Sequence, residues 1–429
     1  MIRRVVAGMG ANSFGMAITI GIQLASLPLF LHFMDTANYG TWLILSAIPA
    51  YLSMADVGMV TAAGNKMTMA MGKDDSLEAN RVFQSAQMFM GIVCGALALM
   101  VVPLMLLAPL PGVTTLDQRV ALAALSIGVL VSLFGGLSEA AFKSTQRYAT
   151  GTVAGNLVRV GEWLGFMAGL ATVGSFAAVA VTGLAVRLAG TVVSMVLATR
   201  GKHGLSWGTH AADRAEIRSM FKPAVSFMAF PLANALSFQG VTLLVGALFG
   251  PIAVALFNTY RTIARVAVQV TAIFSFSLWP EFSRLFGQGA MATVNRLFLR
   301  SALLSAAQSL LLSLILYFLS PWLLRIWTHG AIEFIPSLMV LMLLYAAVGG
   351  IWHIPRVLLM ATNRHVGLAY WSILAGMFSV GLAWLMGREL QLNGVGAAML
   401  MSELFIAIVC SLLAYSAITD NNKTRAVAQ

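Results

Sequence analysis

The sequence predicts an all-α polytopic membrane protein, with twelve transmembrane helices in two six-helix bundles around a central cavity. Hydrophobic residues make up 59% of the 429-residue chain and charged residues only 10%, whereas about a quarter of the residues in a soluble domain are charged. The apolar residues suffice for about twelve spans of about 20 residues each. Their long runs lack the alternation of membrane β-strands, so the spans are expected to be helices.

Apolar windows follow one another along the chain, separated by short polar breaks. They cover residues 11–33, 39–62, 84–108, 118–142, 152–172, 174–198, 223–249, 251–276, 300–324, 334–360, 367–387 and 394–418. The first window follows Arg3 and Arg4 and is longer than the apolar core of a signal peptide. We therefore expect it to remain as the first membrane span.

The longest polar segment lies near the midpoint of the chain and divides it into two halves. We predict a first bundle at 1–199, a cytoplasmic linker at 200–222 and a second bundle at 223–429. Between Ala212 and Arg218, charged and apolar residues are mixed in a pattern compatible with an amphipathic helix on the membrane surface.

A weak internal repeat relates the two halves. In each half a proline-containing first span leads through a very short turn into the second span, at Phe33-Met34-Asp35 and at Phe249-Gly250-Pro251. With six spans in each half, the two repeats have the same orientation and are related by an axis along the membrane normal.

The basic residues of the loops predict the orientation. With the N-terminus inside, eighteen Lys and Arg residues fall on the cytoplasmic side, and only Arg119, Arg325 and Arg388 on the other. Because Lys and Arg accumulate in cytoplasmic loops, both termini are expected in the cytoplasm. The chain has a net charge of +11. Because its basic residues are spread over alternate loops, we do not expect it to bind nucleic acid.

The sequence lacks the motifs that are typical of several functional classes. Cys94 and Cys410 both lie in apolar runs, which excludes a disulfide framework. The sequence has no phosphate-binding loop, no His/Cys cluster with metal spacing and no nucleophile elbow. We therefore expect no metal, no cofactor and no enzymatic activity.

Five arginines lie within predicted spans: Arg159, Arg187, Arg261, Arg265 and Arg356. Each ionisable group in the hydrocarbon costs about 2.5–3.5 kcal/mol on insertion scales. The arginines must therefore face a cavity, a partner or the headgroups. Together with three acids in the spans, they give the membrane interior a net positive charge.

The eighth span carries the most informative stripe. Asn258, Arg261, Arg265 and Gln269 are spaced by three and four residues, so they share one face of a helix. The two arginines, one turn apart, repel each other, which favours an anion held between or opposite them. The alternative is that they pair with acids of other spans, Asp56 or Glu403. Both acids are also candidates for ion coupling or charge balance.

The fifth and sixth spans supply further candidates for substrate binding. Arg159 and Glu162 are three residues apart and can pair on one helix face. The same helix carries Gly161, Gly165 and Gly169, a ridge that permits close helix packing. Arg187 has no acid within reach on its own helix, which makes it a candidate to face the cavity.

Neutral polar groups on the first span of each half complete the predicted site. Asn12 and Gln23 share a face of the first span with Thr19 and Ser26, and Asn234 lies on the seventh span. Such side chains could bind the hydroxyl groups of a sugar. Hydrogen bonding between helices explains them equally well.

Four short segments stand out within the twelve-span organisation: Tyr39-Gly40-Thr41-Trp42, Asp56-Val57-Gly58, Phe257-Asn258-Thr259-Tyr260-Arg261 and Trp279-Pro280-Glu281. In this organisation and these segments the chain resembles the Wzx-type polysaccharide flippases of the multidrug/oligosaccharidyl-lipid/polysaccharide (MOP) exporter superfamily. The resemblance covers nearly the whole chain as a diffuse pattern. The first span departs from related families, because it lacks the carboxylate that multidrug and toxin extruders (MATE transporters) often use for ion coupling.

The resemblance implies a MATE-like fold and the transport of an undecaprenyl-diphosphate-linked oligosaccharide in a bacterial inner membrane. Alternating access of the two halves would move it from the cytoplasmic to the periplasmic leaflet, for O-antigen or related lipopolysaccharide. Arg261 and Arg265 match best the cationic residues that hold the diphosphate in such flippases. The implied partners are this lipid-linked oligosaccharide, the lipid bilayer and the polysaccharide polymerase machinery.

Two other functions remain open at the level of sequence. A multidrug or small-molecule antiporter of the same fold would favour an acidic cavity for cationic drugs, which the arginines oppose. A membrane polysaccharide polymerase or ligase generally needs a large outer loop with catalytic residues, whereas the outer loops predicted here are short.

Overall fold

The computed structural model describes residues 2–108, 112–201, 204–288, 290–362 and 364–426. Within these residues the regular structure is helical throughout. The helices are α1 (Ile2–Phe33), α2 (Thr36–Ala50), the 3₁₀ turn η1 (Tyr51–Asp56), α3 (Met59–Gly72), α4 (Ser76–Leu107), α5 (Leu116–Ser144), α6 (Tyr148–Thr172), α7 (Phe176–Thr199), α8 (Arg214–Ala235), the π turn η2 (Leu236–Gly240), α9 (Val241–Ser277), α10 (Trp279–Gly287), α11 (Met291–Trp327), α12 (Pro336–Ile351), α13 (His353–Ala361) and α14 (Val366–Ala426).

The predicted fold class is confirmed. In the described part of the chain, nine helical segments are long and apolar enough to cross a membrane. Two of them contain a break, at Gly250 and at Gln391, where the backbone leaves the helical region, so each supplies two spans. Helix α6, whose 25 residues include Arg159 and Glu162, is the twelfth span.

Large apolar side chains cover the outside of these helices. Leu99, Leu107 and Phe318 are 80%, 79% and 72% exposed. Soluble monomers rarely expose apolar side chains in such numbers, because contact with water is unfavourable. These surfaces therefore face lipid, and the chain is a multi-pass membrane protein.

The second span differs from its predicted extent of 39–62. The structure continues the helical path from Thr36 to Gly72 as α2, η1 and α3. It is interrupted at Val57 and Gly58, which adopt the left-handed conformation with φ values of 51° and 78°. Hydropathy shows where a helix is apolar and not where it ends. The polar end of α3 around Lys66 was therefore not predicted to be helical.

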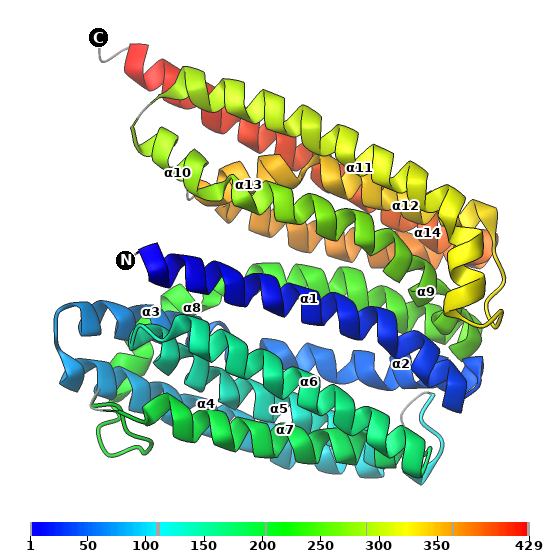
Figure 1. The fold of residues 1–429 in the computed structure, drawn as a ribbon, viewed down its shortest axis with the longest axis horizontal. Helices are drawn as coiled ribbons and strands as arrows, with labels where there is room; N and C mark the ends of the chain where they lie inside the picture. The colour runs from blue at the N-terminus through cyan, green and yellow to red at the C-terminus, as the bar shows by residue number, and fades with distance from the viewer. Residues whose placement is uncertain (1, 109–111, 202–203, 289, 363, 427–429) are drawn as a thin grey trace. The chain divides into compact units, whose positions relative to one another are not determined.

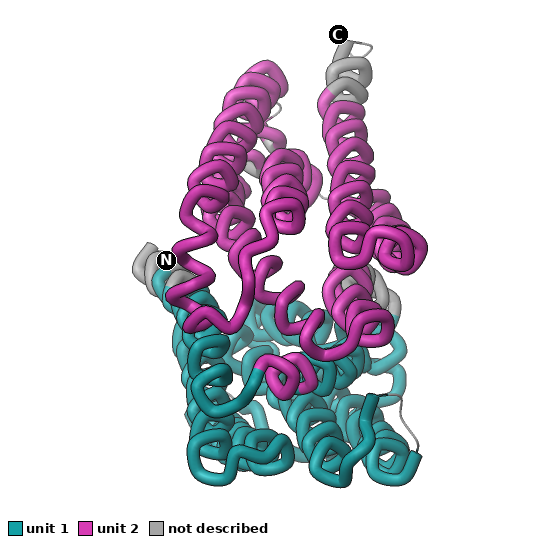
Figure 2. Tube along the Cα trace, turned by 90° about the vertical axis from the view of Figure 1, so that its right-hand side faces the viewer, with its two compact units in different colours: residues 1–35, 42–228 teal, residues 36–41, 229–429 magenta. Residues whose placement is uncertain are grey.

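The chain forms two compact units, coloured in Figure 2. Unit 1 comprises Met1–Asp35 and Trp42–Met228, and unit 2 comprises Thr36–Thr41 and Ala229–Gln429. In unit 1, α6 packs against α1 and α7, and α5 packs against α4 and α7 (Figure 1). In unit 2, α9 packs against α11, α12 and α14.

The predicted glycine ridge of α6 is where this helix meets α7. A Cβ atom on Gly165 would lie 2.8 Å from the Thr182 carbonyl oxygen, and one on Gly169 would lie 2.6 Å from that of Ala178. A side chain at either position would push the helices apart. The ridge thus brings the polar side chains of α6 and α7 within reach of each other.

Side chains of neighbouring helices cap two helix starts. The Asp117 carboxylate of α5 accepts hydrogen bonds from the backbone N–H groups of Phe176 and Ala177 at 3.0 and 2.9 Å, at the beginning of α7. In unit 2, Tyr260 of α9 accepts a hydrogen bond from the Ile335 N–H group at 2.5 Å, before α12. The Tyr260 hydroxyl also donates to the Glu333 carbonyl oxygen at 2.7 Å.

Candidate functional site

Arg261 of α9 is buried in unit 2, at 4% exposure. Its guanidinium donates to the Phe238 carbonyl oxygen at 3.0 Å and to the Thr242 hydroxyl at 2.7 Å. It also donates to the side-chain oxygen of Asn258, its predicted neighbour on the stripe. The turn η2 presents the Phe238 carbonyl, so a local irregularity of the backbone provides one of the acceptors.

Arg265 lies one turn further along α9 and is half-buried. Its guanidinium carbon is 4.5 Å from the centre of the Phe238 ring, and that of Arg261 is 4.1 Å from the same ring. A cation over an aromatic face gains about 0.5–2 kcal/mol. One ring therefore positions both cations, and hydrogen bonds to described residues additionally hold Arg261 in place.

Neither arginine pairs with a carboxylate of the described residues. The ion pairs found there are Lys66–Glu216, Arg81–Glu78 and Arg187–Glu162. The two acids that the sequence suggested as partners of these arginines form hydrogen bonds with other groups. Glu403 accepts a hydrogen bond from the Trp352 indole at 2.8 Å, and Asp56 accepts one from the Gly58 N–H group at 2.9 Å. Gln269, the last member of the stripe, is half-buried.

The charges of unit 1 are arranged differently from the prediction. Glu162 of α6 pairs with Arg187 of α7 through two hydrogen bonds, one of them at 2.5 Å, and not with Arg159. Arg187 has no acid within reach on its own helix, as the sequence indicated, but close packing of α6 and α7 brings Glu162 of the neighbouring helix to it. Spacing along one helix could not reveal a partner on the neighbouring helix.

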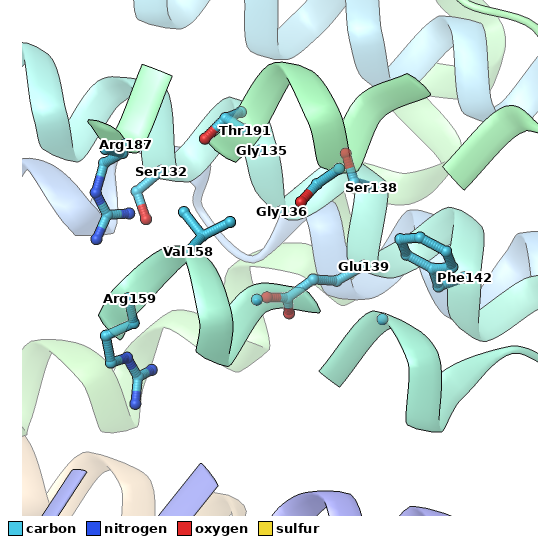
Figure 3. A pocket seen from close by; sticks show the side chains of 13 residues that line it. Ser132, Gly135, Gly136, Ser138, Glu139, Phe142, Val158, Arg159, Arg187 and Thr191 are labelled. Carbon is cyan, nitrogen blue, oxygen red and sulfur yellow. The ribbon is translucent and has the colours of Figure 1, made fainter. Parts of the chain in front are cut away.

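Arg159 is exposed, and its guanidinium donates to the Thr19 hydroxyl of α1 at 2.8 Å. On α6 it also lines a polar pocket between α5, α6 and α7 (Figure 3). Arg159 and Arg187 lie at one end of this pocket and Phe142 at the other, with Glu139 between them (Figure 3).

The pocket encloses about 120 Å³, which is room for several water molecules but not for an oligosaccharide. The Ser138 hydroxyl in its wall is 1% exposed and has no hydrogen-bond partner among the described residues. This pocket was not predicted from the sequence. The signal was present as small and polar residues at helical spacing on α5: Ser132, Gly135, Gly136 and Glu139.

The polar face of α1 packs against α6. Besides the bond of Thr19 to Arg159, Ser26 accepts a hydrogen bond from the Trp163 indole at 2.9 Å. These two contacts favour the interpretation as interhelical hydrogen bonds over sugar binding. Gln23 is half-buried on the same helix, Asn234 of α8 is exposed, and the side chain of Asn12 lies outside the described residues.

The described residues contain no group of three or more His, Cys, Asp or Glu side chains that could hold a metal ion.

No family model and no curated protein sequence matches the chain. Solved structures match its fold over nearly the whole length. The inward-facing conformation of a multidrug resistance MATE family transporter of the MOP superfamily aligns with a TM-score of 0.72 and 12% identity, over 96% of this chain and 95% of that one. The outward-facing conformation of such a transporter gives 0.66 and 12%, over 98% and 96%.

A third structure is a MOP superfamily transporter from Pyrococcus furiosus, whose binding pocket has reverse polarity, which suggests a different function. It aligns with a TM-score of 0.65 and 12% identity, over 98% of this chain and 94% of that one. The chain therefore has the fold of the MATE transporters of the MOP superfamily.

Proposed function

We propose that this protein is a flippase for an undecaprenyl-diphosphate-linked oligosaccharide in a bacterial inner membrane, with both termini in the cytoplasm. Its cargo moves from the cytoplasmic to the periplasmic leaflet by alternating access. Solved structures of the same fold are described in inward- and outward-facing conformations, which supports this kind of transport. The polysaccharide polymerase machinery is the proposed recipient of the cargo.

The observation that carries the proposal is the pair of cations on α9, neither of which pairs with a carboxylate among the described residues. Neutral groups of Phe238, Thr242 and Asn258 accept hydrogen bonds from Arg261. The Phe238 ring also contacts Arg265. A charge without a counter-charge in a membrane is costly, and such groups commonly mark substrate pathways. An anionic substrate would supply the missing counter-charge.

A diphosphate suits these two side chains. Guanidinium groups bind phosphate oxygens through two parallel hydrogen bonds. Because Arg261 has its donors committed to unit 2, we assign phosphate binding chiefly to Arg265 and a positioning role to Arg261. Outward movement of a negative cargo also runs with an inside-negative membrane potential, which is worth about 2.3 kcal/mol per charge per 100 mV.

The test uses Arg265→Ala in a strain that lacks its own flippase and depends on this protein for surface polysaccharide. A charge-assisted hydrogen bond contributes about 1.5–3 kcal/mol, so export should fall at least tenfold while lipid-linked repeat units accumulate in the inner leaflet. Arg265→Lys should restore part of the export. Arg300→Ala removes an exposed arginine of unit 2 and serves as the matched control. Normal surface polysaccharide with Arg265→Ala would refute this assignment.

A second candidate is a small-molecule antiporter, because solved structures of this fold include multidrug resistance transporters. Cationic drugs call for acidic side chains, whereas the described residues around Arg261 and Arg265 are neutral. Increased drug sensitivity on deletion, with unchanged surface polysaccharide, would favour this candidate over the flippase.

A further inference from the structure

After residue 203, the segment between the two halves is attached to unit 1 by hydrogen bonds. Residues 204–213, here called the strap, lie against α4. The side-chain oxygens of Gln84 and Gln87 accept hydrogen bonds from backbone N–H groups of strap residues 211 and 208, at 2.7 and 2.8 Å. The Trp207 indole donates to the Met195 carbonyl oxygen at 2.9 Å. The strap therefore fixes the point at which α8 begins.

The first two turns of α8 then bury one face in unit 1. Glu216 pairs with Lys66, whose Nζ atom lies 2.5 and 2.7 Å from its two carboxylate oxygens. Met220 is 2% exposed and belongs to the core of unit 1, against which Ile217 also packs. These contacts set the rotation of the helix, so the opposite face is directed outward.

That outward face carries Arg214, Arg218 and Phe221, spaced by four and three residues on one helix stripe. All three side chains are exposed, Phe221 at 47%. Together with Ile217 they line a shallow cavity of about 390 Å³. The stripe thus combines two cations with an apolar side chain at an open surface.

Acids nearby do not neutralise this stripe. Glu216 is committed to Lys66, and the Asp213 carboxylate accepts a hydrogen bond from the Ala215 N–H group at 2.8 Å. In the described part of the chain, no ion pair involves Arg214 or Arg218. Two positive charges therefore remain available on the side that the loop charges assign to the cytoplasm.

We propose that the stripe Arg214–Arg218–Phe221 docks onto anionic phospholipids of the cytoplasmic leaflet. The two guanidinium groups bind the headgroup phosphates, and Phe221 inserts at the boundary of the acyl chains, as in amphipathic helices that lie on a membrane. The negative surface potential of this leaflet attracts basic residues next to a membrane span. The proposal is independent of the cargo that the protein carries.

The experiment compares the full-length protein with the double variant Arg214→Gln/Arg218→Gln, purified in a neutral detergent. Phosphatidylglycerol is titrated in, with phosphatidylcholine as the reference lipid, and native mass spectrometry records binding. Each basic residue near an anionic surface contributes about a fivefold gain in affinity, so the double variant should bind phosphatidylglycerol about 25-fold more weakly. Binding of phosphatidylcholine should be unchanged.

The matched control is Lys73→Gln/Arg200→Gln, which removes two exposed charges outside the stripe. It should change phosphatidylglycerol binding less than about twofold, if the stripe and not overall charge is responsible. Wild-type protein supplies a second measurement, because the preference for phosphatidylglycerol should weaken when salt shortens the screening length from about 10 to about 3 Å. Equal losses in both double variants, or a preference that salt leaves intact, would overturn the proposal.

Discussion

The two units differ in the partners of the charged side chains within their helices. Unit 1 pairs Arg187 with Glu162 across two helices and places Glu139 in the same pocket as Arg159. Unit 2 holds Arg261 and Arg265 with a carbonyl, a hydroxyl, an amide and a ring. In unit 1 the two arginines lie together with two carboxylates. In unit 2 the described groups that contact the two arginines are all neutral. This imbalance is the reason why the proposed function assigns the anionic part of the cargo to unit 2.

The largest expected effect comes from breaking the balance in unit 1. Glu162→Gln leaves the Arg187 guanidinium without its counter-charge, which costs about 3–5 kcal/mol for a buried pair. We expect the lower end, since the two side chains remain 16% and 17% exposed. Thermal unfolding of the purified protein measures the loss.

The double variant Glu162→Gln/Arg187→Gln should recover part of this loss, because it removes both charges together. The control Glu78→Gln breaks a more exposed pair with Arg81 and should cost at most about 1 kcal/mol. Additive losses in the double variant would show that the pair does not stabilise unit 1.

The next effect separates the two arginines of unit 2. Arg261→Ala removes a buried donor to three acceptors, and unsatisfied buried groups cost about 1–3 kcal/mol each. We expect a loss of about 2–4 kcal/mol, measured as a lower unfolding temperature. Arg265→Ala should leave stability within about 1 kcal/mol, because the Arg265 guanidinium contacts the face of the Phe238 ring. A larger stability loss for Arg265→Ala than for Arg261→Ala would reverse the assigned roles.

A smaller effect is expected where unit 2 uses a neutral group at a helix start. Tyr260→Phe removes the hydroxyl that bonds both the Glu333 carbonyl and the Ile335 N–H group. Leaving these groups unsatisfied should lower stability by about 1–3 kcal/mol. Tyr317→Phe is the control, since that hydroxyl has no hydrogen bond to the described residues, and no change is expected. Equal unfolding temperatures for the two variants would contradict the role of Tyr260.

The smallest effect concerns the corresponding charged cap in unit 1. Asp117→Asn keeps an acceptor for the N–H groups at the start of α7 but removes the negative charge there. The favourable interaction with the helix dipole contributes about 0.3–1 kcal/mol, and a loss of this size is expected in thermal unfolding at low ionic strength. The exposed Asp74, changed to Asn, should have no effect. A loss that persists at high salt would argue against the electrostatic explanation.

Sequence predicted the spans well because apolar length is a property of each segment alone. It identified α6 as a span despite Arg159 and Glu162, and it located the turn at Gly250, where φ is 81°. It failed on partners, as with Arg187 and Glu162, because these depend on how two helices pack. The Phe238 carbonyl that accepts a hydrogen bond from Arg261 could not be predicted either, because its position depends on the backbone of η2 and not on any side chain.

The π turn at Leu236–Gly240 makes this part of the molecule sensitive to chain length. Its backbone brings the Phe238 carbonyl within reach of both the Thr242 hydroxyl and Arg261. Deleting a single residue here would return the turn to ordinary α-helical geometry and remove the irregularity that presents the Phe238 carbonyl. Arg261 would then lose one of its three acceptors without being mutated, so the length of this turn controls how firmly that side chain is held.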